Sequence, residues 1–187
     1  ENDLAAFENL DGIVIPGGFG HSGFEGKINA ARLARESNLP ALMIGLGAQA
    51  AAIEFARNVM GLSDADSTEF EKKTPHPIVI RRSDGNSFKK GAFVTRLDSD
   101  SELAKAYGKT EITERHRHKY QFNKSYKNMF NAAGLRFVGE SADGKIPETF
   151  ELKSNRFYMG VIYHPEYVSR PTRPNPLITA FLKACDD

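Results

Sequence analysis

The sequence predicts an α/β fold in which a mostly parallel central sheet has flanking helices and a smaller antiparallel portion. Two observations support this prediction. Up to Met60, short apolar runs alternate with helical patterns, and such βαβα order implies parallel strands joined by right-handed helical crossovers. Beyond Gly61 the apolar runs become shorter and alternating, which predicts further strands and therefore a mixed sheet.

The first part of the chain contains two strand and helix units. Residues 12–15 form a short β-branched run that a Pro-Gly-Gly turn ends, which is typical of a buried strand. Residues 24–37 place apolar side chains at helical spacing. Pro40 then separates this helix from a second buried strand at 41–44. Small and apolar residues on one helical face predict the second helix at 48–60.

The rest of the chain is expected to complete one domain, residues 1–187, because no linker divides it. Asp143-Gly144 indicates a hairpin between two of the expected strands. A stiff proline-rich loop at 170–176 precedes a last helix. The expected strands are 77–80, 92–97, 135–139, 149–152 and 158–163, and the expected helices are 103–107 and 124–133.

Composition argues against several classes of function. With 25 Lys plus Arg against 24 Asp plus Glu, the net charge gives no support for a nucleic-acid partner. The most apolar stretch, 41–56, is broken by polar residues and is shorter than the ~20 residues of a membrane-spanning helix. A single cysteine, Cys185, favours a reducing, cytoplasmic setting. The first residues lack an initiator Met, so we expect a part of a longer polypeptide, truncated at its N-terminus.

A glycine-rich segment, residues 18–23, matches the dinucleotide pattern G-x-G-x-x-G between a predicted strand and helix. A nucleotide site is disfavoured, because the next strand ends in Met43-Ile44-Gly45 and lacks the acidic residue that binds a ribose. Successive glycines after a strand can instead expose backbone N–H groups that hold a developing oxyanion. A plain tight turn is the alternative.

Residues 44–49 have the strand, tight turn and small residues of a nucleophile elbow. The residue at the tip of such an elbow commonly has a strained positive φ, which glycine adopts without strain. The tip here is Gly45, which carries no side chain. Gly45 is therefore interpreted either as the position of a lost nucleophile or as a turn glycine.

His164-Pro165-Glu166 follows the predicted strand 158–163. Residues two apart in an extended segment project to the same side, so Glu166 can orient His164. A neutral imidazole held by a carboxylate can act as general base for a neighbouring thiol or hydroxyl. A structural histidine is the alternative.

Residues 114–120 alternate basic and ring side chains. A metal site at its two histidines is disfavoured, because zinc usually has at least three protein ligands and the neighbouring arginines repel cations. Binding of a carboxylate ligand and a solvated strand face are the other interpretations. The acidic loop 64–69 lacks the spacing of an EF-hand, and its Glu69 could meet the ammonium group of a ligand.

Several stretches together resemble the glutamine amidotransferase domain of CTP synthase, a class I amidotransferase of flavodoxin-like α/β architecture. The resemblance covers nearly the whole chain. Class I relatives in general share only the elbow, the early glycines and the His-Pro-Glu, so the matches in the middle favour the CTP synthase family. The specific stretches are 16–20, 53–59, 66–70, 114–118, 164–166 and 169–171.

This resemblance implies hydrolysis of glutamine and passage of ammonia through a tunnel to a synthetase domain of the same polypeptide. That absent domain uses ATP and Mg to activate UTP, which is then aminated to CTP. The implied ligand is glutamine or glutamate, and no cofactor or metal is implied in this domain. The resemblance further implies a cytoplasmic parent protein that forms a homo-oligomer and has neither a nucleic-acid nor a membrane partner.

By resemblance, Gly45 occupies the nucleophile position, His164 is the base and Glu166 orients it. Gly18 and the backbone after the elbow resemble an oxyanion hole, and Lys119 takes the position that faces the substrate carboxylate. The implied substrate-binding residues are Gly17, Gly18, Phe19, Leu46, Gln49, Glu69, Lys119 and Tyr120.

The chain departs from the family at three places. The family's cysteine aligns with Gly45, so we expect glutaminase turnover to be absent. Lys119 stands where the family has arginine, and an ammonium cannot make the two parallel hydrogen bonds that a guanidinium gives a carboxylate. Residues 85–91 match the family's glycine-rich segment only in part. A non-catalytic glutamine-binding module and an assembly domain therefore stay as alternatives.

Overall fold

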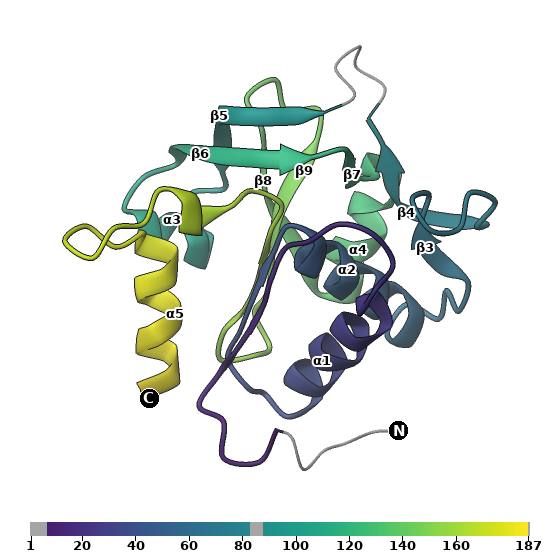
Figure 1. Cartoon of the computed structure of the whole chain (residues 1–187), viewed down its shortest axis with the longest axis horizontal. Helices are drawn as coiled ribbons and strands as arrows, with labels where there is room; N and C mark the ends of the chain where they lie inside the picture. Colours follow the sequence, from purple (N-terminus) through teal and green to yellow (C-terminus); the bar gives the residue numbers. More distant parts are fainter. Residues whose placement is uncertain (1–6, 83–87, 187) are drawn as a thin grey trace.

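The computed structural model describes residues 7–82 and 88–186, so residues 85–87 of the partly matching segment lie outside it. Within the described residues the chain forms a seven-stranded sheet and a three-stranded sheet (Figure 1). The larger sheet has the order β1 (Ile13–Ile15), β2 (Ala41–Ile44), β10 (Tyr158–Val161), β9 (Pro147–Leu152), β8 (Leu135–Ser141), β5 (Lys89–Leu97) and β6 (Glu111–His118). The smaller sheet has the order β3 (Ala65–Ser67), β4 (His76–Arg81) and β7 (Tyr120–Phe122).

The larger sheet is mixed, as expected. β1, β2 and β10 pair in parallel, while β9, β8, β5 and β6 continue the sheet in antiparallel pairing. The predicted α/β class is confirmed, but the antiparallel portion is larger than predicted. Asp143-Gly144 lies in the turn of the β8–β9 hairpin, where Gly144 has the positive φ of 69° that such a turn favours.

Helices cover both faces of the larger sheet (Figure 1). α1 (Phe24–Glu36), α2 (Leu46–Asn58) and α4 (Lys127–Ala133) pack in one apolar cluster, and α3 (Glu102–Tyr107) and α5 (Pro176–Asp186) belong to a second. β2 contributes to both, because Met43 lies in the first cluster and its neighbours Leu42 and Ile44 lie in the second. Short 3₁₀ turns are η2 (Lys124–Tyr126) and η3 (Pro165–Tyr167).

Several predicted boundaries were wrong. The second helix, expected at 48–60, begins at Leu46, because Gly45 alone makes the turn from β2. The helix predicted at 124–133 is divided into η2 and α4. β10 ends at Val161 rather than at 163, because its partner β2 turns away after Ile44.

Three strands were not predicted. β3 lies inside the acidic segment that we expected to be a loop, and it pairs in parallel with β4. β6 alternates exposed and buried residues along its whole length. Its buried side chains are mostly polar, so an apolar pattern could not reveal it, although a strand face was one interpretation of 114–120. β7 follows it after a single residue.

Candidate active site

Gly45 is the sharp link between β2 and α2. Its backbone angles are φ 55° and ψ −113°, and its N–H donates a hydrogen bond of 2.8 Å to the Val161 carbonyl. Gly47, in the first turn of α2, lies against β1, and a Cβ there would collide with the carbonyl oxygen of Ile15. These two glycines let the helix begin directly at the strand end, as the elbow interpretation requires.

His164 reaches the same place from the end of β10. Its backbone N–H donates to the Arg115 carbonyl at 2.8 Å, and its Nδ1 lies 2.7 Å from Glu166 Oε1. A carboxylate only accepts, so Nδ1 carries a proton, and in the neutral ring Nε2 then has the lone pair. A Cβ placed on Gly45 would lie 3.2 Å from His164 Nε2. The free nitrogen of the ring therefore faces the tip of the elbow.

A cavity lies between these elements and brings together residues far apart in the sequence. Gly17 and Glu166 are the only predicted site residues outside the lining described for this cavity. Gly17 lies against the His164 ring, where a Cβ would be 2.8 Å from Cε1, and Glu166 holds the neighbouring Nδ1 of that ring. The lining residues are Gly18, Phe19, Gly45, Leu46, Gln49, Glu69, Arg117, His118, Lys119, Tyr120 and His164.

Charged and polar side chains line part of this cavity. Burial raises the pKa of Glu69, while a hydrogen bond from the Gly20 backbone and the nearby Lys119 ammonium act against that rise. Gln49 Oε1 is buried and, within the described residues, has no hydrogen-bond partner. An acid, a cation and an unpartnered carbonyl oxygen thus line one cavity, a combination that suits an amino-acid ligand.

Arg117 and His118 also line the cavity, although neither was among the predicted site residues. His118 Nδ1 lies 2.7 Å from the Tyr120 carbonyl, so this nitrogen donates. His118 Nε2 then accepts from His116 Nδ1 at 3.0 Å. Burial lowers the pKa of both rings, that of His118 to about 3, so both are neutral at pH 7. The pair fixes the backbone that carries Lys119.

Neither histidine belongs to a metal site of the described chain, in which no group of three or more His, Cys, Asp or Glu could hold an ion. Among the helices of residues 7–82 and 88–186, none is long and apolar enough to cross a membrane.

The fold and the cavity define a class of protein. A family model described as glutamine amidotransferase class-I matches residues 1–184, and the chain belongs to this family. The "CTP synthase" of Syntrophus aciditrophicus (strain SB) is 45% identical over an alignment of 184 positions, which covers 95% of this chain and 34% of that protein. The "CTP synthase" of Koribacter versatilis (strain Ellin345) is 45% identical over an alignment of 193 positions, which covers 98% of this chain and 35% of that protein.

Solved structures agree with this assignment. The glutaminase domain of Trypanosoma brucei CTPS with bound acivicin has 37% identity and a TM-score of 0.91, covering 97% of this chain and 73% of that one. A glutamine amidotransferase from Thermotoga maritima has 15% identity and a TM-score of 0.57, covering 92% of this chain and 64% of that one, and it supports the fold alone. The predicted resemblance to the amidotransferase domain of CTP synthase is confirmed. The chain spans about a third of the length of the curated relatives.

Proposed function

We propose that this chain is the glutamine-binding domain of a CTP synthase whose hydrolytic step requires a cysteine at position 45. Ammonia would pass to a synthetase domain of the same polypeptide, which uses ATP and Mg to aminate UTP. One observation carries the proposal. His164 Nε2 faces the position of a side chain on Gly45 at 3.2 Å from its Cβ, while Glu166 holds the other ring nitrogen.

A thiol at this position would give its proton to His164 Nε2, and the thiolate would attack the amide carbon of glutamine. Glu166 would stabilise the imidazolium that forms. The proton would then pass to the leaving ammonia, and water would release glutamate from the acyl-enzyme. Gly45 supplies no sulfur, so binding is expected in this chain and turnover is not.

The oxyanion of this reaction needs backbone donors. α2 begins at Leu46, and the first N–H groups of a helix have no acceptor within it. The N-terminal end of the helix dipole adds positive potential there. Leu46 and Gly18 both line the cavity, so we assign their N–H groups to the oxyanion.

The polar lining matches the backbone groups of glutamine. Lys119 would bind the α-carboxylate, Glu69 the α-ammonium, and Gln49 Oε1 would accept an N–H of the ligand. Phe19 and Leu46 would contact the aliphatic part.

Two assays separate binding from turnover. Calorimetry on this chain should show glutamine binding, and an ammonia assay should show no release. Gly45→Cys should release ammonia. Gly45→Ala should not, because it places a side chain at the same positive φ but supplies no sulfur. Ammonia release by the Gly45 chain itself would overturn the nucleophile assignment.

Gly45 itself favours a second candidate, a non-catalytic module that binds glutamine and signals to a partner domain. A Gly45→Cys variant that binds glutamine but releases no ammonia would support this module over the hydrolytic domain. If calorimetry detects no heat of binding at millimolar glutamine, both of these candidates are excluded and an assembly role remains.

A further inference from the structure

Tyr167 lies directly over the imidazole of His164. The two rings are nearly parallel, with an interplanar angle of 10° and 4.6 Å between centroids. Both belong to the turn that contains η3, where the Tyr167 N–H donates to the His164 carbonyl at 3.1 Å. Side chains three residues apart eclipse in a 3₁₀ turn, and Pro165 fixes the first helical position. The local sequence therefore creates the stack.

This parallel arrangement distinguishes His164 from the other described histidines that contact aromatic rings. His21 meets Phe70 at 89°, His76 meets Tyr126 at 86°, and His116 meets Tyr163 at 58°. Tyr167 is 41% exposed, and its hydroxyl has no hydrogen-bond partner within the described chain. Within the described residues, the stack on His164 is the only aromatic contact of the Tyr167 ring.

The stack supplies a constraint on the face of the His164 ring that the Glu166 hydrogen bond does not. Glu166 holds Nδ1 in the plane of the imidazole, but its side chain is 42% exposed, so water competes for that carboxylate. Gly17 borders the ring at Cε1. Neither contact prevents the ring from tilting about its hydrogen bond. An aromatic ring against the face of the imidazole prevents this tilt, and its π face also favours an imidazolium.

We propose that Tyr167 is a positioning residue, which holds the His164 ring with Nε2 directed at residue 45. The inference deepens the proposed function and rests on it, because the ring orientation matters for glutamine hydrolysis only if His164 is the base.

The orientation can be measured by NMR in this chain without any turnover. The Hε1 proton of His164 should show a nuclear Overhauser effect to the Gly45 Hα protons, because Cε1 lies 3.2 Å from the Cβ position of Gly45. Tyr167→Ala should weaken this signal strongly, and Tyr167→Phe should retain it. Tyr167→Leu keeps apolar bulk without a ring and should behave as Tyr167→Ala does. Met129→Ala removes exposed apolar surface on α4 and is the matched control.

The kinetic consequence can be measured in the Gly45→Cys background. Tyr167→Ala should lower kcat for glutamine about tenfold with KM unchanged, because base catalysis depends on ring geometry while ligand binding does not. Tyr167→Phe should keep the full rate.

An undiminished Overhauser effect in both Tyr167→Ala and Tyr167→Leu would overturn the inference, as would a change confined to KM. If Gly45→Cys proves inactive while Tyr167→Ala still loses the Overhauser effect, the proposed function fails and the positioning role remains.

Discussion

Gly45 shows at the level of one residue how glycine permits a sharp turn at the proposed nucleophile position. Its φ of 55° and ψ of −113° suit glycine and would strain any other residue by about 1–3 kcal/mol. The backbone already places the Cβ position of residue 45 at 3.2 Å from His164 Nε2. A cysteine at position 45 would therefore supply the thiol of the proposed reaction and lower the free energy of unfolding.

Glu69 gives a prediction for the pH dependence of ligand binding. An ammonium group binds the ionised carboxylate, and burial raises the pKa of Glu69 above its ordinary 4.5. The affinity for glutamine should therefore fall as the pH is lowered towards 4.5, beginning at a higher pH than for an exposed glutamate.

Calorimetry over a pH series tests this expectation. Glu69→Gln removes the titrating group, so it should weaken binding at pH 7 and flatten the pH dependence. An equal pH dependence in the parent chain and Glu69→Gln would show that another group controls binding.

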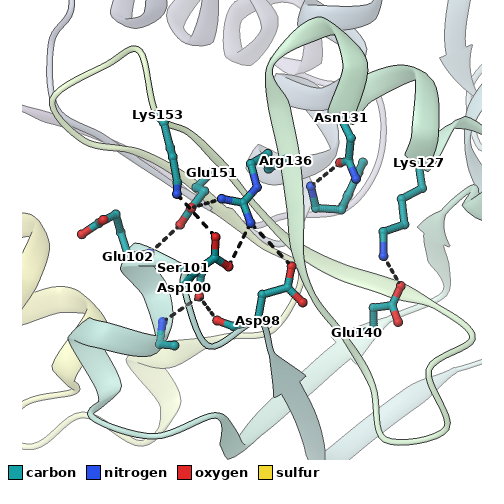
Figure 2. Close-up of polar contacts among 12 residues, drawn as sticks. Asp98, Asp100, Ser101, Glu102, Lys127, Asn131, Arg136, Glu140, Glu151 and Lys153 are labelled. Carbon is teal, nitrogen blue, oxygen red and sulfur yellow. Dashed lines mark hydrogen bonds and ion pairs between the residues drawn. The ribbon is translucent and has the colours of Figure 1, made fainter.

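At the scale of elements, α3 depends on a cap that Figure 2 shows among the polar contacts around Arg136. Ser101 Oγ accepts from the Ala104 N–H at 3.0 Å and donates to the Asp98 carbonyl at 2.6 Å. Glu151 Oε2 accepts from the Glu102 N–H at 2.9 Å. These bonds satisfy the first N–H groups of a short helix.

Ser101→Ala should lower the free energy of unfolding by about 1–2 kcal/mol, because a buried cap is lost. Urea unfolding measures this loss. Ser154→Ala, at an exposed turn, should change the same quantity by less than about 0.5 kcal/mol. Equal effects of the two variants would contradict a capping role.

Two buried histidines of β6 lead to a prediction of how the free energy of unfolding depends on pH. His116 and His118 bind protons in the unfolded chain near the ordinary pKa of 6.5, but in the folded chain burial lowers both values, that of His118 to about 3. The unfolded state thus binds more protons below pH 6.5, so stability falls as the pH falls. Each neutral histidine adds a slope of about 1.4 kcal/mol per pH unit.

Urea unfolding at a series of pH values between about 7 and 5, the range in which an ordinary histidine titrates, gives this slope. His118→Gln should reduce it by about one histidine's share. An unchanged slope would show that His118 binds protons equally in the folded and unfolded chains over this pH range.

At the scale of the whole molecule, the parallel strands place the site. The glycine turn after β1, Gly45 after β2 and His164 after β10 all follow the carboxyl ends of neighbouring strands, which meet at one edge of the sheet. The antiparallel part then brings the end of β6 to the same cavity, with Lys119 and His118.

A domain exchange tests the role of the chain in a complete protein. Placed in the CTP synthase of Syntrophus aciditrophicus instead of the matching third, this chain should permit CTP formation from UTP and ATP with ammonium salt but not with glutamine. Gly45→Cys should restore the glutamine-dependent reaction. CTP formation with glutamine before that substitution would contradict the proposed loss of hydrolysis.

Much of the fold could be predicted, because local signals mark β1, α1 and β2. A proline or glycine follows each of these elements closely, and the apolar spacing identifies its type. β6 could not be found in this way, because Glu114, His116 and His118 are buried polar side chains. Their burial depends on partners from other elements, such as Asn175 and Tyr107 around Glu114.

Sequence alone was enough to indicate the class of the protein and its candidate residues, including Gly45 at the proposed nucleophile position. Tertiary structure was needed to show that most of these residues line one cavity, that Arg117 and His118 join them, and that Tyr167 stacks on His164. Turn chemistry and periodicity are properties of neighbouring residues, so a sequence displays them directly. The insertion of β10 beside β2, in contrast, joins segments more than a hundred residues apart through packing that no local pattern encodes.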